Sequence, residues 1–168
     1  KLHPGEEIRT PLVLLLSWQG ERMDSKNVFR RMVLDHFAPK RDGKPVPCPV
    51  SIYGWGSDPA SRHIAKMNMA IEHKLPIDCY WVEAEWAQGS GSWTENVGTW
   101  DERLDLYPGG MREVGTAAHD RGLEFVLWFE PGRVHEGTRI FEEHPEWLRG
   151  PDIQWAGNWI FEYGNEEA

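Results

Sequence analysis

The sequence has little of what marks membrane, redox or nucleic-acid-binding proteins. Its apolar runs, such as residues 12–16, fall far short of the ~20 residues that span a bilayer. No signal peptide is visible, so the compartment, cytoplasmic or secreted, stays open. Cys48 and Cys79 have no metal or redox spacing, and we expect both thiols in the core. The formal net charge of −9 argues against nucleic acid and anionic membranes as partners.

Metal and phosphate motifs are also missing. The seven histidines are scattered without the spacing of a zinc site, and we expect them to be solvated or satisfied within the core. A glycine-rich stretch at residues 89–93 lacks the strand-to-helix context of a phosphate loop. The sequence therefore predicts no metal and no cofactor.

Tryptophan, in contrast, is abundant. The 168 residues include 10 tryptophans. Core packing accounts for some of them, but flat indole faces also stack on the apolar faces of pyranose rings. A sugar-binding groove explains the excess better than packing alone.

Short apolar stretches alternate with helical patterns from residue 49 onward. Buried strands are predicted at residues 49–53, 77–83, 123–129 and 158–162. Helices are predicted between them at residues 61–74, 111–118 and 138–143, the first capped by Ser61. This alternation predicts an α/β fold whose four strands are parallel and adjacent in chain order.

The first 47 residues have a different character. Residues 12–16 predict a buried strand, residues 25–37 a helix, and residues 39–49 a linker. We interpret residues 1–47 as the tail of a preceding β-domain with a connecting helix, and residues 48–168 as the start of another domain.

Each predicted strand ends in tryptophan, glutamate or both; for the fourth strand these are Trp159 and Glu162. Ligands bind at the carboxyl ends of parallel strands, so these side chains are candidates for a common site. The candidates are Trp55, Glu83, Trp86, Trp128 and Glu130, together with Trp100 from the long loop at residues 87–106. A generic α/β domain with structural tryptophans is the plainer alternative.

Several motifs in order resemble glycoside hydrolase family 36, the melibiase-like α-galactosidases. The clearest are Tyr-Trp-Val-Glu-Ala-Glu-Trp at residues 80–86, Asn-Val-Gly-Thr-Trp at residues 96–100, Leu-Trp-Phe-Glu-Pro at residues 127–131 and Glu-His-Pro-Glu-Trp-Leu at residues 143–148. Residues 2–11 are similar to the last strand of that family's N-terminal β-supersandwich. Residues 161–168 are similar to an element that follows the fourth strand of this stretch.

The resemblance implies part of a (β/α)8 barrel, about four βα units, from an enzyme that hydrolyses terminal α-galactosides with retention. Its nucleophile and acid/base follow the region matched here, so no catalytic residue is expected within the chain, which we expect to be incomplete and inactive alone. The implied substrate-binding residues are Trp55, Glu83, Trp86, Trp100, Trp128 and Glu130.

The implied partner is an oligosaccharide or glycoside, and the chain could form a homo-oligomer. Several residues depart from the family pattern: Glu83 replaces an Asp, Glu85 replaces a Gly and Gly132 replaces a Glu. Ala84 stands where many members have a second Asp, although a bacterial subgroup also has Ala there. A degenerate carbohydrate-binding module without turnover is the alternative function.

Overall fold

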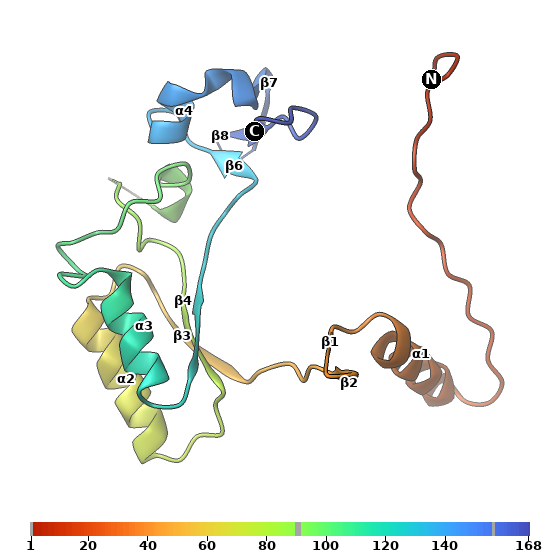
Figure 1. Ribbon diagram of the computed structural model, residues 1–168, viewed down its shortest axis with the longest axis horizontal. Coiled ribbons are helices and arrows are strands. Elements are labelled where there is room, and N and C mark those ends of the chain that lie inside the picture. Colours follow the sequence, from red (N-terminus) through yellow and green to blue (C-terminus); the bar gives the residue numbers. More distant parts are fainter. Residues whose placement is uncertain (1, 90–91, 156) are drawn as a thin grey trace. The chain divides into compact units, whose positions relative to one another are not determined.

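A computed structural model describes residues 2–89, 92–155 and 157–168, which form two compact units, Lys1–Cys48 and Pro49–Ala168 (Figure 1). The first unit contains helix α1 (Arg22–His36) and a small antiparallel hairpin of β1 (Lys40–Arg41) and β2 (Lys44–Pro45). The helix starts with a capping box in which Glu21 and Asp24 bond each other's backbone amides.

Two expectations for this unit are wrong. Residues 12–16 form irregular backbone rather than a buried strand, and Leu12 and Leu15 are 86% and 90% exposed. An apolar run becomes a buried strand only when a neighbouring strand pairs with it, and the described residues provide none here. Cys48 is exposed, whereas Cys79 is buried as expected.

The second unit is built on a parallel sheet of β3 (Ser51–Gly54), β4 (Cys79–Val82) and β5 (Glu124–Leu127). The strand order is β3-β4-β5, and the register aligns Tyr53, Trp81 and Val126 across it. Helix α2 (Ala60–Glu72) connects the first pair and α3 (Met111–His119) precedes the third strand. The predicted parallel β-α-β units are therefore confirmed for these three strands.

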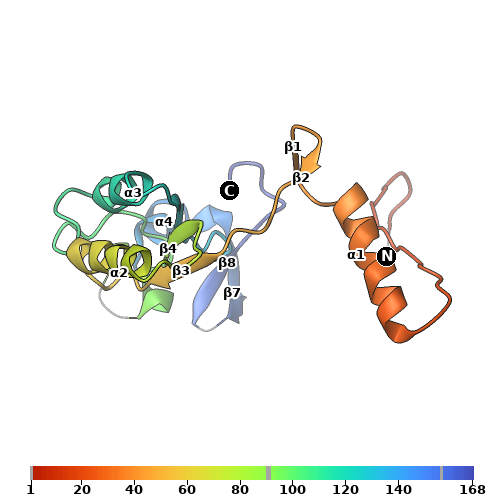
Figure 2. The same cartoon turned by 90° about the horizontal axis from the view of Figure 1, so that it is seen from below.

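Helices α2 and α3 lie side by side and cover one face of the sheet (Figures 1 and 2). Tyr80 and Val82 of β4 point to that face and are fully buried, together with Met67 of α2 and Val114 of α3. No described residue range covers the opposite face, where Val126 is 43% exposed. The core of this unit thus lies between the sheet and its two helices.

The buried stripe of α2 differs from the predicted one. Its buried residues are Ala60, His63, Met67 and Ala70. Ile71 and Leu75, which the apolar spacing had placed inward, are 44% and 49% exposed. The helix starts one residue earlier than expected, after Pro59, whose carbonyl accepts from the amides of Arg62 and His63. Ser61 is therefore not its N-cap.

The fourth predicted strand does not join the parallel sheet. β8 (Asn158–Phe161) pairs antiparallel with both β6 (Arg133–Val134) and β7 (Leu148–Trp155), in the order β6-β8-β7. Only two residues separate β7 from β8, and so short a connection forces neighbouring strands to run antiparallel. The prediction of four adjacent parallel strands is wrong, and within the described residues the parallel sheet has three strands and does not close.

The last helical elements are α4 (Arg139–Glu143), at the predicted position, and a 3-10 turn, η2 (Pro145–Trp147). No helix among the described residues is long and apolar enough to cross a membrane. In the same residues, no group of three or more His, Cys, Asp or Glu side chains could hold a metal ion.

Candidate functional site

A pocket of about 280 Å³ opens where the three parallel strands end. Its lining residues are Trp55, Glu83, Ala84, Trp93, Trp128 and Glu130. Trp55 directly follows β3, Glu83 follows β4 and Trp128 follows β5. Because parallel strands end at the same edge of a sheet, these three side chains meet there without any special loop geometry.

Four of the six residues predicted from the sequence line this one pocket: Trp55, Glu83, Trp128 and Glu130. Trp55 is 44% exposed, and the other three are half-buried. The pocket therefore combines carboxylates, which accept hydrogen bonds from hydroxyl groups, with indole faces, which pack against C–H surfaces. Such a lining fits a polyhydroxylated ring better than an apolar ligand or an anion.

Trp86 and Trp100 lie behind the pocket wall. Trp86 is only 2% exposed, and its indole Nε1 donates a 2.8 Å hydrogen bond to the carbonyl of Trp128. Its ring centre lies 5.9 Å from that of Trp100 and 5.0 Å from that of Phe129. Trp100 in turn lies 6.1 Å from Trp128. These two tryptophans therefore fix the position of Trp128, and burial of Trp86 leaves no surface for a ligand to contact.

Trp93 is a pocket residue that sequence reasoning did not select. It belongs to the 3-10 turn η1 (Trp93–Glu95) in the long loop after β4, and its ring packs edge-on against Trp128 at 5.7 Å. The tryptophans of that loop indicated that it contributes to a binding site. Trp93 and Trp100 both lie in the loop, however, and no local sequence feature showed which of them lines the pocket. The structure places Trp93 in the wall and Trp100 behind it.

Glu85 adopts an unusual backbone conformation beside the pocket. Its φ angle is +77°, in the left-handed region that favours glycine. In the family motif that residues 80–86 resemble, a glycine is usual at this position. The chain therefore holds a glutamate in a conformation that costs about 1–2 kcal/mol for a residue with a Cβ atom.

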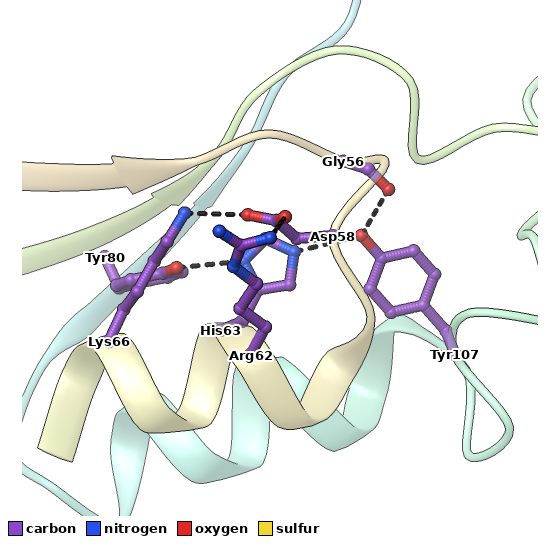
Figure 3. Close-up of polar contacts among 7 residues, drawn as sticks. All are labelled: Gly56, Asp58, Arg62, His63, Lys66, Tyr80 and Tyr107. Carbon is purple, nitrogen blue, oxygen red and sulfur yellow. Dashed lines mark hydrogen bonds and ion pairs between the residues drawn. The ribbon is translucent and has the colours of Figure 1, made fainter.

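A buried polar network connects α2 with the loop that contains Gly56 (Figure 3). His63 is fully buried, with Nδ1 2.8 Å from the hydroxyl of Tyr80 and Nε2 3.1 Å from the hydroxyl of Tyr107. Tyr107 donates its proton to the carbonyl of Gly56 at 2.6 Å. Since that hydroxyl has a single proton, His63 Nε2 must donate to it, and Nδ1 accepts from Tyr80.

The charged side chains next to this network, Asp58, Arg62 and Lys66, lie at its edge. Burial lowers the pKa of His63, although Asp58 opposes the shift. Burial also raises the pKa values of Tyr80 and Tyr107 far above their ordinary range. Burial alone would raise the pKa of Asp58, but Lys66 at 2.7 Å and Arg62 at 3.1 Å more than offset it and lower that pKa. The network is thus neutral inside and ionic at its rim.

A second, larger cavity of about 380 Å³ shares the turn η1 through Glu95. Several of its polar groups are already engaged: Gln88 donates to the carbonyl of Glu102, Thr138 donates to that of His135, and Thr99 accepts from the amide of Arg139. Its lining residues within the described ranges also include no Trp, Tyr or Phe, so it offers a ligand ring no flat apolar face and is the weaker candidate despite its size.

Comparison with known proteins decides the family. The Melibiase family model matches residues 21–155. The chain belongs to the Melibiase family of α-galactosidases. A curated relative, the α-galactosidase Mel36A of Lactobacillus acidophilus, is 25% identical over 151 residues, which are 88% of this chain and 20% of the relative. An α-galactosidase of Pediococcus pentosaceus is 19% identical over 150 residues, again 20% of its own length. This Melibiase-family chain thus spans about a fifth of the curated relatives it matches.

Solved structures share the fold. The galactosidase domain of the α-galactosidase–sucrose kinase AgaSK has a TM-score of 0.67 at 18% identity, over 81% of this chain and 20% of that one. The α-galactosidase of Lactobacillus brevis has a TM-score of 0.63 at 23% identity, over 73% and 17%. AgaA from Geobacillus stearothermophilus, solved in complex with stachyose, has a TM-score of 0.63 at 20% identity, over 71% and 18%.

Proposed function

We propose that this Melibiase-family chain forms one wall of the galactose-binding pocket of a retaining α-galactosidase. The observation that carries the proposal is the meeting of Trp55, Glu83, Trp128 and Glu130 in one pocket at the carboxyl edge of the parallel sheet. The three parallel strands are, in this proposal, the first strands of a (β/α)8 barrel, in which that edge is the active-site face.

In this pocket the side chains bind and orient the sugar. Glu83 and Glu130 accept hydrogen bonds from ring hydroxyls, while Trp55, Trp93 and Trp128 pack against the C–H face of the pyranose. Trp86 and Trp100 act indirectly by fixing the position of Trp128. The volume of about 280 Å³ lies just below the range for small-molecule pockets, about 300–1,000 Å³, which suits one sugar ring rather than several.

The reacting carboxylates lie elsewhere in the proposed enzyme. Retaining hydrolysis needs a nucleophile and an acid/base about 5–5.5 Å apart. The family resemblance implies that both groups follow the segment matched here, so we assign Glu83 and Glu130 to binding. The relatives AgaA with stachyose and AgaA with raffinose support an α-galactoside as the substrate class.

The test compares pocket variants of the complete gene product. Hydrolysis of p-nitrophenyl α-galactoside is expected in the wild type, and Glu83→Gln and Trp55→Ala should each reduce kcat/KM by at least about tenfold. The matched control is Glu124→Gln, because Glu124 starts β5 at the opposite end of the sheet. Turnover by residues 1–168 alone, abolished by a substitution within them, would show that the catalytic groups were assigned wrongly.

A non-catalytic carbohydrate-binding module is the second candidate. The specific observation in its favour is Glu85, whose charge and strained backbone stand beside the pocket where a glycine is usual. Binding of methyl α-galactoside by the complete gene product, measured by calorimetry and unaccompanied by any hydrolysis, would favour this second function.

A further inference from the structure

Arg133 is a buried cation directly behind the pocket. It starts β6, three residues after Glu130, and its side chain is only 8% exposed. Its Nη2 atom lies 2.7 Å from Oε2 of Glu130. Its guanidinium carbon lies 5.0 Å from the centre of the Trp93 ring. Burial of an arginine is costly unless a carboxylate or an aromatic face compensates it, and here both do.

These two contacts reach pocket residues from separate parts of the chain. Glu130 follows β5, whereas Trp93 belongs to the long loop after β4. The ion pair engages Oε2 of Glu130 and leaves Oε1 for a ligand. The guanidinium supports the ring of Trp93, which forms a T-shaped pair with the ring of Trp128. One side chain therefore fixes both an acceptor and an aromatic surface of the same pocket.

The position of Arg133 also links the pocket to the antiparallel sheet. Its backbone is paired with Ile160 of β8, so the guanidinium is carried by a strand rather than by a mobile turn. The positive charge additionally reduces the repulsion between Glu130 and Glu83, which line the same pocket.

We propose that Arg133 is a positioning residue that holds Glu130 and Trp93 in the geometry that binds the sugar. It acts through these two side chains and does not itself contact the ligand. This inference rests on the proposed function, since it assigns Arg133 to the same pocket.

The test is a double-mutant cycle in the complete gene product, with methyl α-galactoside as the probe and dissociation constants from calorimetry. Arg133→Met should weaken binding at least about tenfold, as expected when one partner of a buried charged pair is removed. Glu130→Gln should also weaken it. The double variant should bind about as well as Arg133→Met alone, because Glu130 is no longer held in place once the arginine is gone.

The control is Arg149→Met, because Arg149 forms an exposed pair with Glu162 at 3.0 Å in the same antiparallel sheet. It should leave the affinity unchanged. If Arg133→Met does not fold, Arg133→Lys replaces it in the cycle, since lysine keeps the charge and loses the planar fork. Multiplicative effects of the two substitutions, or wild-type affinity in the arginine variant, would overturn this inference alone. Absence of binding by the wild type would overturn the proposed function, and this inference with it.

Discussion

At the scale of single residues, one backbone conformation beside the pocket is strained, because a residue other than glycine adopts a positive φ angle there. Glu85 is held at φ +77° between the pocket residue Glu83 and the buried Trp86. A left-handed conformation at a residue with a Cβ atom persists only where the surrounding structure imposes it, and such positions cluster at functional sites. Removing the side chain should therefore change stability and leave the pocket wall in place.

The substitution Glu85→Gly should stabilise the folded chain by about 0.5–1 kcal/mol. It relieves about 1–2 kcal/mol of strain, and the added freedom of glycine in the unfolded chain offsets part of the gain. Chemical denaturation followed by tryptophan fluorescence measures the difference. Ala65→Gly, at an exposed position in the middle of α2, is the control and should cost about 1 kcal/mol. A loss of stability in the Glu85 variant would contradict the strain argument.

His63 should make stability depend on pH. Burial lowers its folded-state pKa below the ordinary value of 6.5, so the unfolded chain binds the proton first as pH falls. The stabilising contribution is complete above pH 6.5 and is lost as pH falls from there through the folded-state pKa. The expected slope is up to about 1.4 kcal/mol per pH unit.

The measurement is the free energy of unfolding between pH 7.5 and pH 5 (roughly the range in which histidine titrates). His63→Gln should flatten the slope in this window. Met69→Gln, at an exposed position of α2, changes no titratable group and should leave the slope unchanged. Asp58 has a lowered pKa, so its stabilising contribution is complete throughout this window and is lost only as pH falls below its ordinary value of 3.8. Equal slopes in wild type and His63→Gln would refute a neutral His63.

At the scale of secondary-structure elements, the loops after β3 and β4 touch each other through backbone. The amide of Gly56 donates to the carbonyl of Ala84 at 2.8 Å. A Cβ atom on Gly56 would lie 2.2 Å from the amide nitrogen of Trp86 and 2.5 Å from the carbonyl oxygen of Ala84. Neither backbone atom can move without displacing the loop that carries Trp55 or the one that carries Glu83.

The substitution Gly56→Ala should therefore destabilise the chain by about 2–4 kcal/mol and weaken sugar binding together with it. Thermal unfolding and calorimetric titration with methyl α-galactoside measure the two effects. Gly115→Ala in α3 is the matched control, because its added Cβ would meet Phe125 at an ordinary 3.4 Å and alanine favours helix. A Gly56 variant as stable as the control would show that these loops are not held together.

Local pattern predicted the parallel strands and the pocket residues at their ends, because both depend on short-range signals. Apolar runs identify β4 and β5, and the residue after each run must lie at the ligand-binding edge once the strands are parallel. The role of His63 within the stripe of α2 was not predictable, since only the tertiary partners Tyr80 and Tyr107 make a buried histidine favourable.

The antiparallel sheet was not predicted from the sequence. The run in β8 was recognised, but its partner was not, because β7 contains Gly150 and Pro151, which disfavour strands. Strand pairing is a non-local property, and a strand's own residues do not specify the neighbour. Arg133 was not predicted for a similar reason. Its role depends on its contact with Trp93, which lies in a loop 40 residues earlier in the chain.

At the scale of the whole molecule, the parallel sheet has unpaired edges and an uncovered face within the described residues. β3 and β5 each have a partner on one side only. The face away from α2 and α3 exposes Tyr53 and Val126, which are 59% and 43% exposed and belong to the same row across the strands. Open edges and exposed apolar faces promote association between chains.

The isolated chain of residues 1–168 should therefore self-associate. Light scattering across a dilution series is expected to show a mass above that of one chain at high concentration, with binding of a dye that detects apolar surface. Val126→Lys should reduce both signals, because it places a charge on the uncovered face. Met69→Lys in α2 is the control. Because Met69 is already exposed on a helix, this substitution should change neither signal. A monomer at every concentration, without dye binding, would show that the sheet is covered in some other way.

The aromatic cluster formed by the pocket wall and the tryptophans behind it has a spectroscopic consequence. The rings of Trp86 and Trp100 lie 5.9 Å apart at 30°, and those of Trp93 and Trp128 lie 5.7 Å apart at 88°. Indoles so close and so differently oriented couple their electronic transitions, so circular dichroism contains a signal from the pairs that no single tryptophan would give. A ligand that reorients Trp93 or Trp128 alters that coupling, so circular dichroism detects ligand binding to the pocket without an added label.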